Sequence, residues 1–98
     1  MLNLDPAHLK TIQAILKEHL SDCEVKAFGS RVTGTHKDYS DLDLVIIGPK
    51  KIERRLLIKL KDSFAESNLP FRVDILDWQR ISPEFRKVIE SQETVKIL

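Results

Sequence analysis

Two aspartates one residue apart open the most apolar stretch of the chain. Asp41 and Asp43 flank Leu42, and the apolar run continues to Ile47. Side chains two apart along a strand point to the same side, so we expect the two carboxylates to lie close together. Like charges at that separation raise each other's pKa unless a cation lies between them. The pair therefore predicts a site for a hard divalent ion such as Mg2+, which binds one or two protein carboxylates and completes its shell with water and substrate phosphate.

A glycine–serine step upstream could supply the other half of such a site. Gly29 follows the alternating segment 24–28, and a glycine there lets the backbone approach a phosphate closely and present its amides. The Ser30 hydroxyl could donate to a phosphate oxygen, and the planar Arg31 cation could neutralise a triphosphate. If the two strands are neighbours, a phosphate cradle and a metal-binding pair meet at one edge of the sheet.

A third carboxylate would complete the usual two-metal arrangement, in which the ions lie about 3.5–4 Å apart. Asp74 is the best candidate, because it lies inside the apolar segment 71–76, where an unpaired charge would be costly. Asp77 follows three residues later, but we expect it past the core of that strand and beside a surface Trp78.

The elements that must position these residues alternate along the chain. Apolar residues at three- and four-residue steps predict helices, and alternating or continuous apolar runs predict strands. The predicted elements are a helix opened by Asp5-Pro6 and running to Leu20, a strand at 24–28, a loop at 30–40 with a short helix near its start, a strand at 42–47, a helix at 51–67, a strand at 71–76, a helix opened by Ser82-Pro83 with Phe85, Val88 and Ile89 on its inner face, and a tail at 94–98 that docks as a short edge strand. This order predicts a small α/β domain of the α+β kind, a mixed sheet of three to four strands covered by helices.

Composition limits the other possibilities. With 98 residues, 42% hydrophobic and 32% charged, we expect one domain over residues 1–98 that is neither disordered nor membrane-spanning. A net charge of +1 argues against nucleic acid as a direct ligand. Cys23 is the single cysteine, so no internal disulfide is expected, and the absence of a cationic-then-apolar leader points to the cytoplasm.

Each site residue also has an ordinary structural explanation. Asp41 and Asp43 could form a solvated turn before a strand, and Gly29 could simply end the strand before it. Arg31 could be a plain surface cation, and Asp74 could pair with a neighbouring cation. Because all of these residues occur together, we favour the chemical interpretation.

Three motifs carry a family resemblance. Residues 28–31 (Phe-Gly-Ser-Arg), 40–44 (Ser-Asp-Leu-Asp-Leu) and 73–75 (Val-Asp-Ile) resemble the signature of the nucleotidyltransferase superfamily that includes DNA polymerase beta. The compact spacing resembles its minimal branch, the MNT-domain proteins. The resemblance implies the nucleotidyltransferase fold and transfer of a nucleoside monophosphate, AMP by preference, from ATP to an acceptor hydroxyl. It assigns Asp41, Asp43 and Asp74 as catalytic metal ligands, with two Mg2+ ions expected, and Gly29, Ser30, Arg31 and Ser40 as nucleotide-binding residues.

The same resemblance implies a partner. Many minimal members are antitoxins paired with a HEPN-domain toxin, and they can adenylylate a tyrosine of that toxin. The first hypothesis is therefore an ATP- and Mg2+-dependent protein adenylyltransferase that acts as an antitoxin, in a homo- or hetero-oligomer and without a membrane. One alternative is a non-catalytic antitoxin that neutralises its partner by stoichiometric binding. Another is a detached catalytic subunit acting on a small molecule or nucleic acid.

Overall fold

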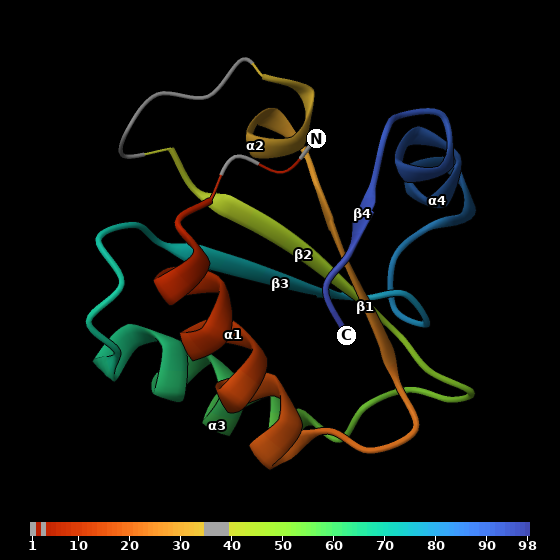
Figure 1. Ribbon diagram of the computed structural model, residues 1–98. Helices are drawn as coiled ribbons and strands as arrows, with labels where there is room; N and C mark the ends of the chain where they lie inside the picture. Colours follow the sequence, from red (N-terminus) through yellow and green to blue (C-terminus); the bar gives the residue numbers. More distant parts are fainter. Residues whose placement is uncertain (1, 3, 35–39) are drawn as a thin grey trace.

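A four-stranded mixed sheet forms the centre of the molecule (Figure 1). The computed structural model describes residues 2, 4–34 and 40–98. The strand order is β3-β2-β1-β4; β1 runs antiparallel to both β2 and β4, whereas β2 and β3 are parallel. The strands are β1 (Glu24–Phe28), β2 (Leu42–Ile47), β3 (Val73–Asp77) and β4 (Val95–Lys96). The predicted mixed sheet is confirmed, including the short edge strand in the tail.

The helix starts that were predicted from capping signals are confirmed. At α1 (Pro6–His19), the Asp5 carboxylate accepts a hydrogen bond of 2.8 Å from an amide of the first turn. At α4 (Pro83–Glu90), the Ser82 hydroxyl accepts one of 3.1 Å in the same way. A proline follows each cap at the first helical position, where its missing N–H is not needed.

The bounds of two predicted elements differ in the structure. The strand predicted at 71–76 is β3 (Val73–Asp77). The helix predicted at 51–67 is α3 (Arg54–Glu66), because the Ile52 amide is held by the Asp77 carboxylate at 2.9 Å instead of entering the helix. The predicted loop at 30–40 opens with the short helix α2 (Ser30–Thr33), as expected. Residues 35–39 of that loop lie outside the described part of the chain.

Helices α1 and α3 pack side by side on one face of the sheet (Figure 1). Their apolar stripes face the strands, so that Ile12, Leu16, Leu60 and Phe64 join the main core. This core also contains the buried strand residues Val25, Ala27, Leu42, Leu44, Ile46 and Ile75.

The opposite face of the sheet is covered only in part. A second apolar cluster there centres on Phe28, Val45 and Ile89, the last from α4. The predicted inner face of this helix was partly wrong, since Phe85 is 38% and Val88 50% exposed. Val88 is about 100° around the helix from Ile89, so both cannot face the sheet, whereas Phe85 lies on the same side as Ile89. The short helix leaves the end of this face that carries Asp43 uncovered.

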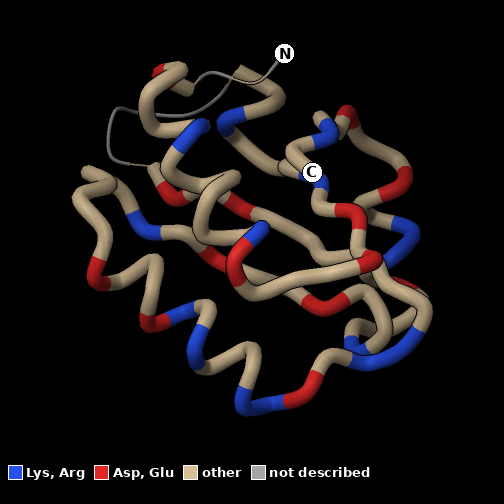
Figure 2. Tube along the Cα trace, turned by 60° about the horizontal axis from the view of Figure 1, so that its bottom comes forward, with Lys and Arg blue, Asp and Glu red and all other residues tan. Residues whose placement is uncertain are grey.

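Charge is distributed evenly over the described chain. Figure 2 shows basic and acidic positions interspersed along the trace, which agrees with the net charge of +1. None of the helices in the described residues has both the length and the apolar composition needed to cross a membrane.

Candidate active site

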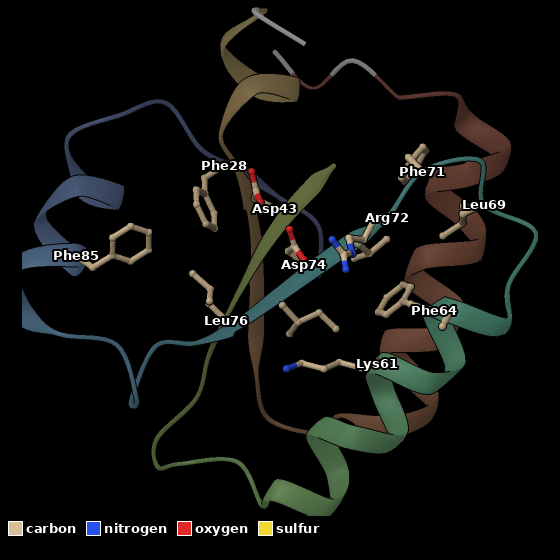
Figure 3. A pocket seen from close by; sticks show the side chains of 13 residues that line it. Phe28, Asp43, Lys61, Phe64, Leu69, Phe71, Arg72, Asp74, Leu76 and Phe85 are labelled. Atoms are coloured by element: carbon tan, nitrogen blue, oxygen red, sulfur yellow. The ribbon is translucent and has the colours of Figure 1, made fainter. Parts of the chain in front are cut away.

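The parallel pairing of β2 and β3 brings the predicted carboxylates together. Asp43 lies directly opposite Asp74 in the register, and Phe28 of β1 lies on the other side of Asp43. Asp41 precedes β2 by one residue and is joined to Asp74 by a side-chain hydrogen bond. Figure 3 shows the Asp43 and Asp74 side chains next to one another. Asp74, which is 31 residues after Asp43 in the sequence, therefore forms one cluster with Asp41 and Asp43.

The aspartates perturb one another electrostatically. Partial burial raises the pKa of Asp43 above the ordinary aspartate value of 3.8, and the neighbouring charges of Asp74 and Asp41 raise it further. Partial burial also raises the pKa of Asp74, together with the charge and hydrogen bond of Asp41, while Arg72 and Lys61 offset part of this rise. The cluster thus carries excess negative charge, which favours a bound cation.

The chemistry of this cluster fits Mg2+. All three side chains offer hard oxygen ligands, and a divalent cation would relieve the repulsion that raises the pKa values of Asp43 and Asp74. Within residues 2, 4–34 and 40–98, no group of three or more His, Cys, Asp or Glu side chains is already arranged to hold a metal ion.

Gly29 packs directly against this cluster. Its φ of 84° and ψ of −158° are accessible to glycine and strained for any other residue. A Cβ placed at this position would collide with Asp43 Oδ2. Its carbonyl accepts from the amides of Val32 and Thr33, both at 3.0 Å, and so begins helix α2. The requirement for glycine is therefore a close approach between backbone and carboxylate, beyond the simple end of a strand.

The amide of Gly29 is already engaged by the chain itself. It donates to Gln92 Oε1 at 3.0 Å, so this N–H is not presented to a phosphate as the sequence had suggested. The predicted cradle is left to the residues that follow, of which Ser30 is half-buried at the first position of α2.

Arg31 is buried, so the alternative that it is a plain surface cation is wrong. The residue is only 6% exposed, and its Nε donates to the Ser40 carbonyl at 2.9 Å. Its guanidinium also lies 4.2 Å from the centre of the Phe71 ring, a cation–π contact. Arg31 thus ties α2 to the segments that lead into β2 and β3. Contact between Arg31 or Ser40 and a triphosphate stays a prediction.

The two acidic residues of β3 have exchanged the environments that we expected. Asp74 is exposed, because it lies on the edge strand β3, on the face of the sheet that is covered only in part. Asp77 is the buried one, at 4% exposure, and it closes the strand instead of following it. Its carboxylate accepts from the amides of Ile52 and Gln79 at 2.9 and 3.0 Å and pairs with Arg80 Nε at 3.3 Å. The high cost of an unpaired buried charge therefore applies to Asp77, where these partners offset it.

Trp78 is half-buried, not a surface residue. It packs against the second apolar cluster, and the Arg86 guanidinium lies 5.2 Å from its ring centre.

A cavity of about 870 Å³ lies beside Asp43 and Asp74 along the edge strand β3 (Figure 3). This volume lies within the range of small-molecule sites in proteins, about 300–1,000 Å³. Aromatic side chains line both ends, and two cations face the carboxylates. The lining includes Phe28, Asp43, Lys61, Phe64, Phe71, Arg72, Asp74 and Phe85.

Lys61, Arg72 and Gln92 were missed from the sequence. Lys61 reaches the cavity only because α3 packs close to the edge strand, and Gln92 lies 63 residues from its partner Gly29. The sequence carries no local signal for either contact. Arg72 could have been suspected from its position two residues before Asp74, which favours contact on the same side of a strand.

The chain is similar to proteins that share this fold and motif. A model of the nucleotidyltransferase domain family matches residues 9–97. The chain is 44% identical over 88 residues to a Haemophilus influenzae (strain ATCC 51907 / DSM 11121 / KW20 / Rd) protein named "Probable protein adenylyltransferase MntA". The match covers 90% of this chain and 77% of that relative. The chain therefore belongs to the nucleotidyltransferase domain family, and it is a nucleotidyltransferase.

Two solved structures share the fold. One is the crystal structure of a toxin-antitoxin with AMP-PNP, with a TM-score of 0.76 and 21% identity over 92% of this chain and 72% of that one. The other is a mutant of the toxin-antitoxin MntA-HpeT, with a TM-score of 0.75, 19% identity and the same coverage. At these identities, the similarity shows only that this chain and the two solved structures share a fold.

Proposed function

We propose that this protein is a Mg2+-dependent adenylyltransferase that transfers AMP from ATP to a tyrosine hydroxyl of a HEPN-domain toxin and thereby acts as an antitoxin. The observation that carries the proposal is the cluster of Asp41, Asp43 and Asp74 beside Gly29, with Asp43 and Asp74 lining one cavity. The relative named as a protein adenylyltransferase supports a protein acceptor. The shared fold with a toxin-antitoxin that was crystallised with AMP-PNP supports ATP as the donor.

Asp41 and Asp43 would hold the metal ion, and Asp74 would serve the acceptor. When bound, the ion would neutralise charge on the α-phosphate and on the departing pyrophosphate. The exposed Asp74 carboxylate lines the cavity, so an acceptor hydroxyl could reach it there.

The reaction is one in-line displacement. The acceptor oxygen forms a bond to the α-phosphorus, and the bond from that phosphorus to the oxygen bridging the α- and β-phosphates breaks. Pyrophosphate leaves with that electron pair, and the hydroxyl proton passes to Asp74. Catalysis rests on positioning and charge neutralisation, because the protein forms no covalent bond to the nucleotide.

The cavity suits an aromatic acceptor. Phe28 and Phe85 meet edge to face at 6.4 Å between ring centres, and both line the cavity that contains Asp43 and Asp74. Phe85 is 38% exposed, so a tyrosine ring of a partner could contact it while its hydroxyl lies near the carboxylates.

The test is transfer of label from ATP to the partner. The purified protein is incubated with ATP labelled on the α-phosphate, Mg2+ and the HEPN partner, and an Asp41→Asn/Asp43→Asn variant is compared with wild type. Asp62→Asn is the matched control, because it makes the same chemical change at an exposed position of α3 that does not line the cavity. We expect wild type and control to label the partner, and the double variant to lose at least about 100-fold in rate.

Two outcomes would contradict the proposal. Equal labelling by the double variant would show that the carboxylate cluster is not the catalytic site. A tight complex without any labelled partner would instead favour the non-catalytic antitoxin that neutralises by stoichiometric binding.

A further inference from the structure

The turn after α4 sends one side chain to the end of β1. Gln92 Oε1 accepts the Gly29 amide at 3.0 Å, and Gln92 Nε2 donates to the Val88 carbonyl at 3.3 Å. A backbone N–H can only donate and a backbone carbonyl can only accept, so these two partners fix which way the glutamine amide points. Gln92 therefore connects the last turn of α4 with the glycine of the candidate active site.

This hydrogen bond replaces a bond of the sheet ladder that β4 is too short to supply. The last pair at this end of the β1–β4 ladder is Ala27 with Val95. The Val25 amide donates across the ladder to Leu98 at 3.0 Å, and amides of alternate residues along a strand face the same neighbour. The Gly29 amide consequently faces the side where the backbone of β4 has ended, and the glutamine carbonyl takes the place of the missing acceptor.

The orientation of the Gly29 peptide affects two neighbouring parts of the candidate site, helix α2 and Asp43. Its carbonyl begins α2, and its missing side chain leaves room for Asp43 Oδ2. Glycine has the widest choice of backbone conformations, so an unheld amide would let this peptide rotate. Rotation would move the start of α2, including Ser30, relative to the carboxylates.

A second contact joins the same two segments. Phe85 of α4 packs edge to face on Phe28, the residue before Gly29, with 6.4 Å between ring centres. Helix α4 is thus fastened to the end of β1 by an aromatic contact near its start and by Gln92 just after its end. The glutamine supplies the polar contact that determines the peptide orientation.

We propose that Gln92 is a positioning residue for the nucleotide. By holding the Gly29 amide, it keeps the Gly29–Ser30 segment in the conformation that accommodates both Asp43 and the phosphates. Gln92 acts through Gly29 and makes no contact with the nucleotide itself. This inference rests on the proposed nucleotidyl transfer, because it assigns Gln92 a part in binding ATP at the same site.

Two substitutions separate the acceptor oxygen from the rest of the side chain. Gln92→Met keeps the length of the chain but has no acceptor for the Gly29 amide, whereas Gln92→Glu keeps an acceptor oxygen. Gln79→Met is the matched control, since it also removes a glutamine bond to a backbone carbonyl, at 2.8 Å to Gly48, away from the cavity.

The first measurement is hydrogen exchange of the Gly29 amide, followed by NMR in protein without nucleotide or metal. We expect exchange to be about five- to tenfold faster in Gln92→Met, which corresponds to the loss of one hydrogen bond of ordinary strength. Exchange should remain near the wild-type rate in Gln92→Glu and in the Gln79→Met control. Unchanged exchange in Gln92→Met would overturn the positioning role.

The second measurement is adenylyl transfer, with binding of the ATP analogue AMP-PNP measured beside it in the absence of acceptor protein, because the imido group of AMP-PNP joins the β- and γ-phosphates and leaves the α–β bridge cleavable. We expect Gln92→Met to raise the KM for ATP and the Kd for AMP-PNP about five- to tenfold, while the KM for the acceptor protein stays within about twofold. A merely structural defect would lower the active fraction and leave both KM values unchanged, which would also overturn the proposal. Wild-type protein that binds AMP-PNP without transferring label would contradict the proposed function alone, because exchange and AMP-PNP binding still test Gln92. Wild-type protein that binds no AMP-PNP would overturn both.

Discussion

Replacing Gly29 with alanine tests the close approach between the backbone and Asp43. Gly29 has φ of +84°, and a Cβ there would collide with Asp43 Oδ2. Gly34 provides a control for positive φ, because its φ is +89° and no heavy atom of the described residues lies within 4 Å of the position that a Cβ would take. Both alanine variants strain the backbone, and only Gly29→Ala also forces the Asp43 carboxylate to move.

The expected losses of stability follow from these two terms. Backbone strain in the left-handed region costs alanine about 1–2 kcal/mol, so Gly34→Ala should lose about that much. Gly29→Ala should cost about 1–3 kcal/mol in backbone strain, because ψ of −158° lies in a region that essentially only glycine populates, and the clash with Asp43 should add about 1–3 kcal/mol. For a domain of this size, 1 kcal/mol shifts the Tm by about 4–8 °C. We therefore expect Gly34→Ala to melt about 4–16 °C lower than wild type, and Gly29→Ala to melt lower still, by at least about 8 °C.

Activity should separate the two variants more sharply than stability. Displacing a catalytic group by about 1 Å can lower a rate by about 100-fold. At a temperature where both variants are folded, we expect Gly29→Ala to lose about that much adenylyl transfer and Gly34→Ala to keep most of it. The assay is circular dichroism melting together with label transfer to the partner. Equal Tm losses in the two variants, or full activity in Gly29→Ala, would refute the packing argument.

Three further predictions concern charge and burial. Burial and the neighbouring carboxylates raise the folded-state pKa of Asp43. Metal-free wild type should therefore lose stability as the pH rises from the pKa of the unfolded state through this raised value. Asp43→Asn should melt at a higher temperature than wild type at pH 7, and this difference should shrink in acid. If Asp43→Asn melts lower at pH 7, the electrostatic strain is not real. Asp77→Ala should lose about 2–4 kcal/mol in urea unfolding because it orphans buried amides, while Arg80→Met loses about 1 kcal/mol or less, and equal losses would contradict this. Burial raises the pKa of Cys23, with smaller contributions from the charges of Asp22 and Asp77, so iodoacetamide should alkylate it more slowly at pH 8 than a free thiol; Asp22→Asn should speed the reaction.

Local features of the chain were predictable because they depend on neighbours in sequence. The caps at Asp5 and Ser82 determine where two helices begin, and periodicity identifies the buried run of β2. The alternation of a strand places Asp41 and Asp43 on one side, and the structure has both near Asp74. The chemical roles of these residues stay predictions until transfer is measured.

Depth of burial was predicted less well, because it depends on what lies across from a residue. Asp74 and Asp77 share one strand, yet the first is exposed and the second is buried by the segment before α3. Val88 belongs to an apolar stripe, yet it is 50% exposed, because it lies about 100° around α4 from the buried Ile89. Periodicity shows which residues share a face and not whether another element covers that face.

The assembly of the site was decided by tertiary structure alone. Asp43 meets Asp74 because β2 and β3 pair in parallel, and a helical connection of 25 residues must cross the sheet to allow that pairing. Gln92 can accept the Gly29 amide because the pairing of β4 with β1 ends at Ala27, two residues before Gly29. The sequence determines which residue types are available for the proposed chemistry. The distances between their side chains depend on strand order and register, which are set when the whole sheet is buried.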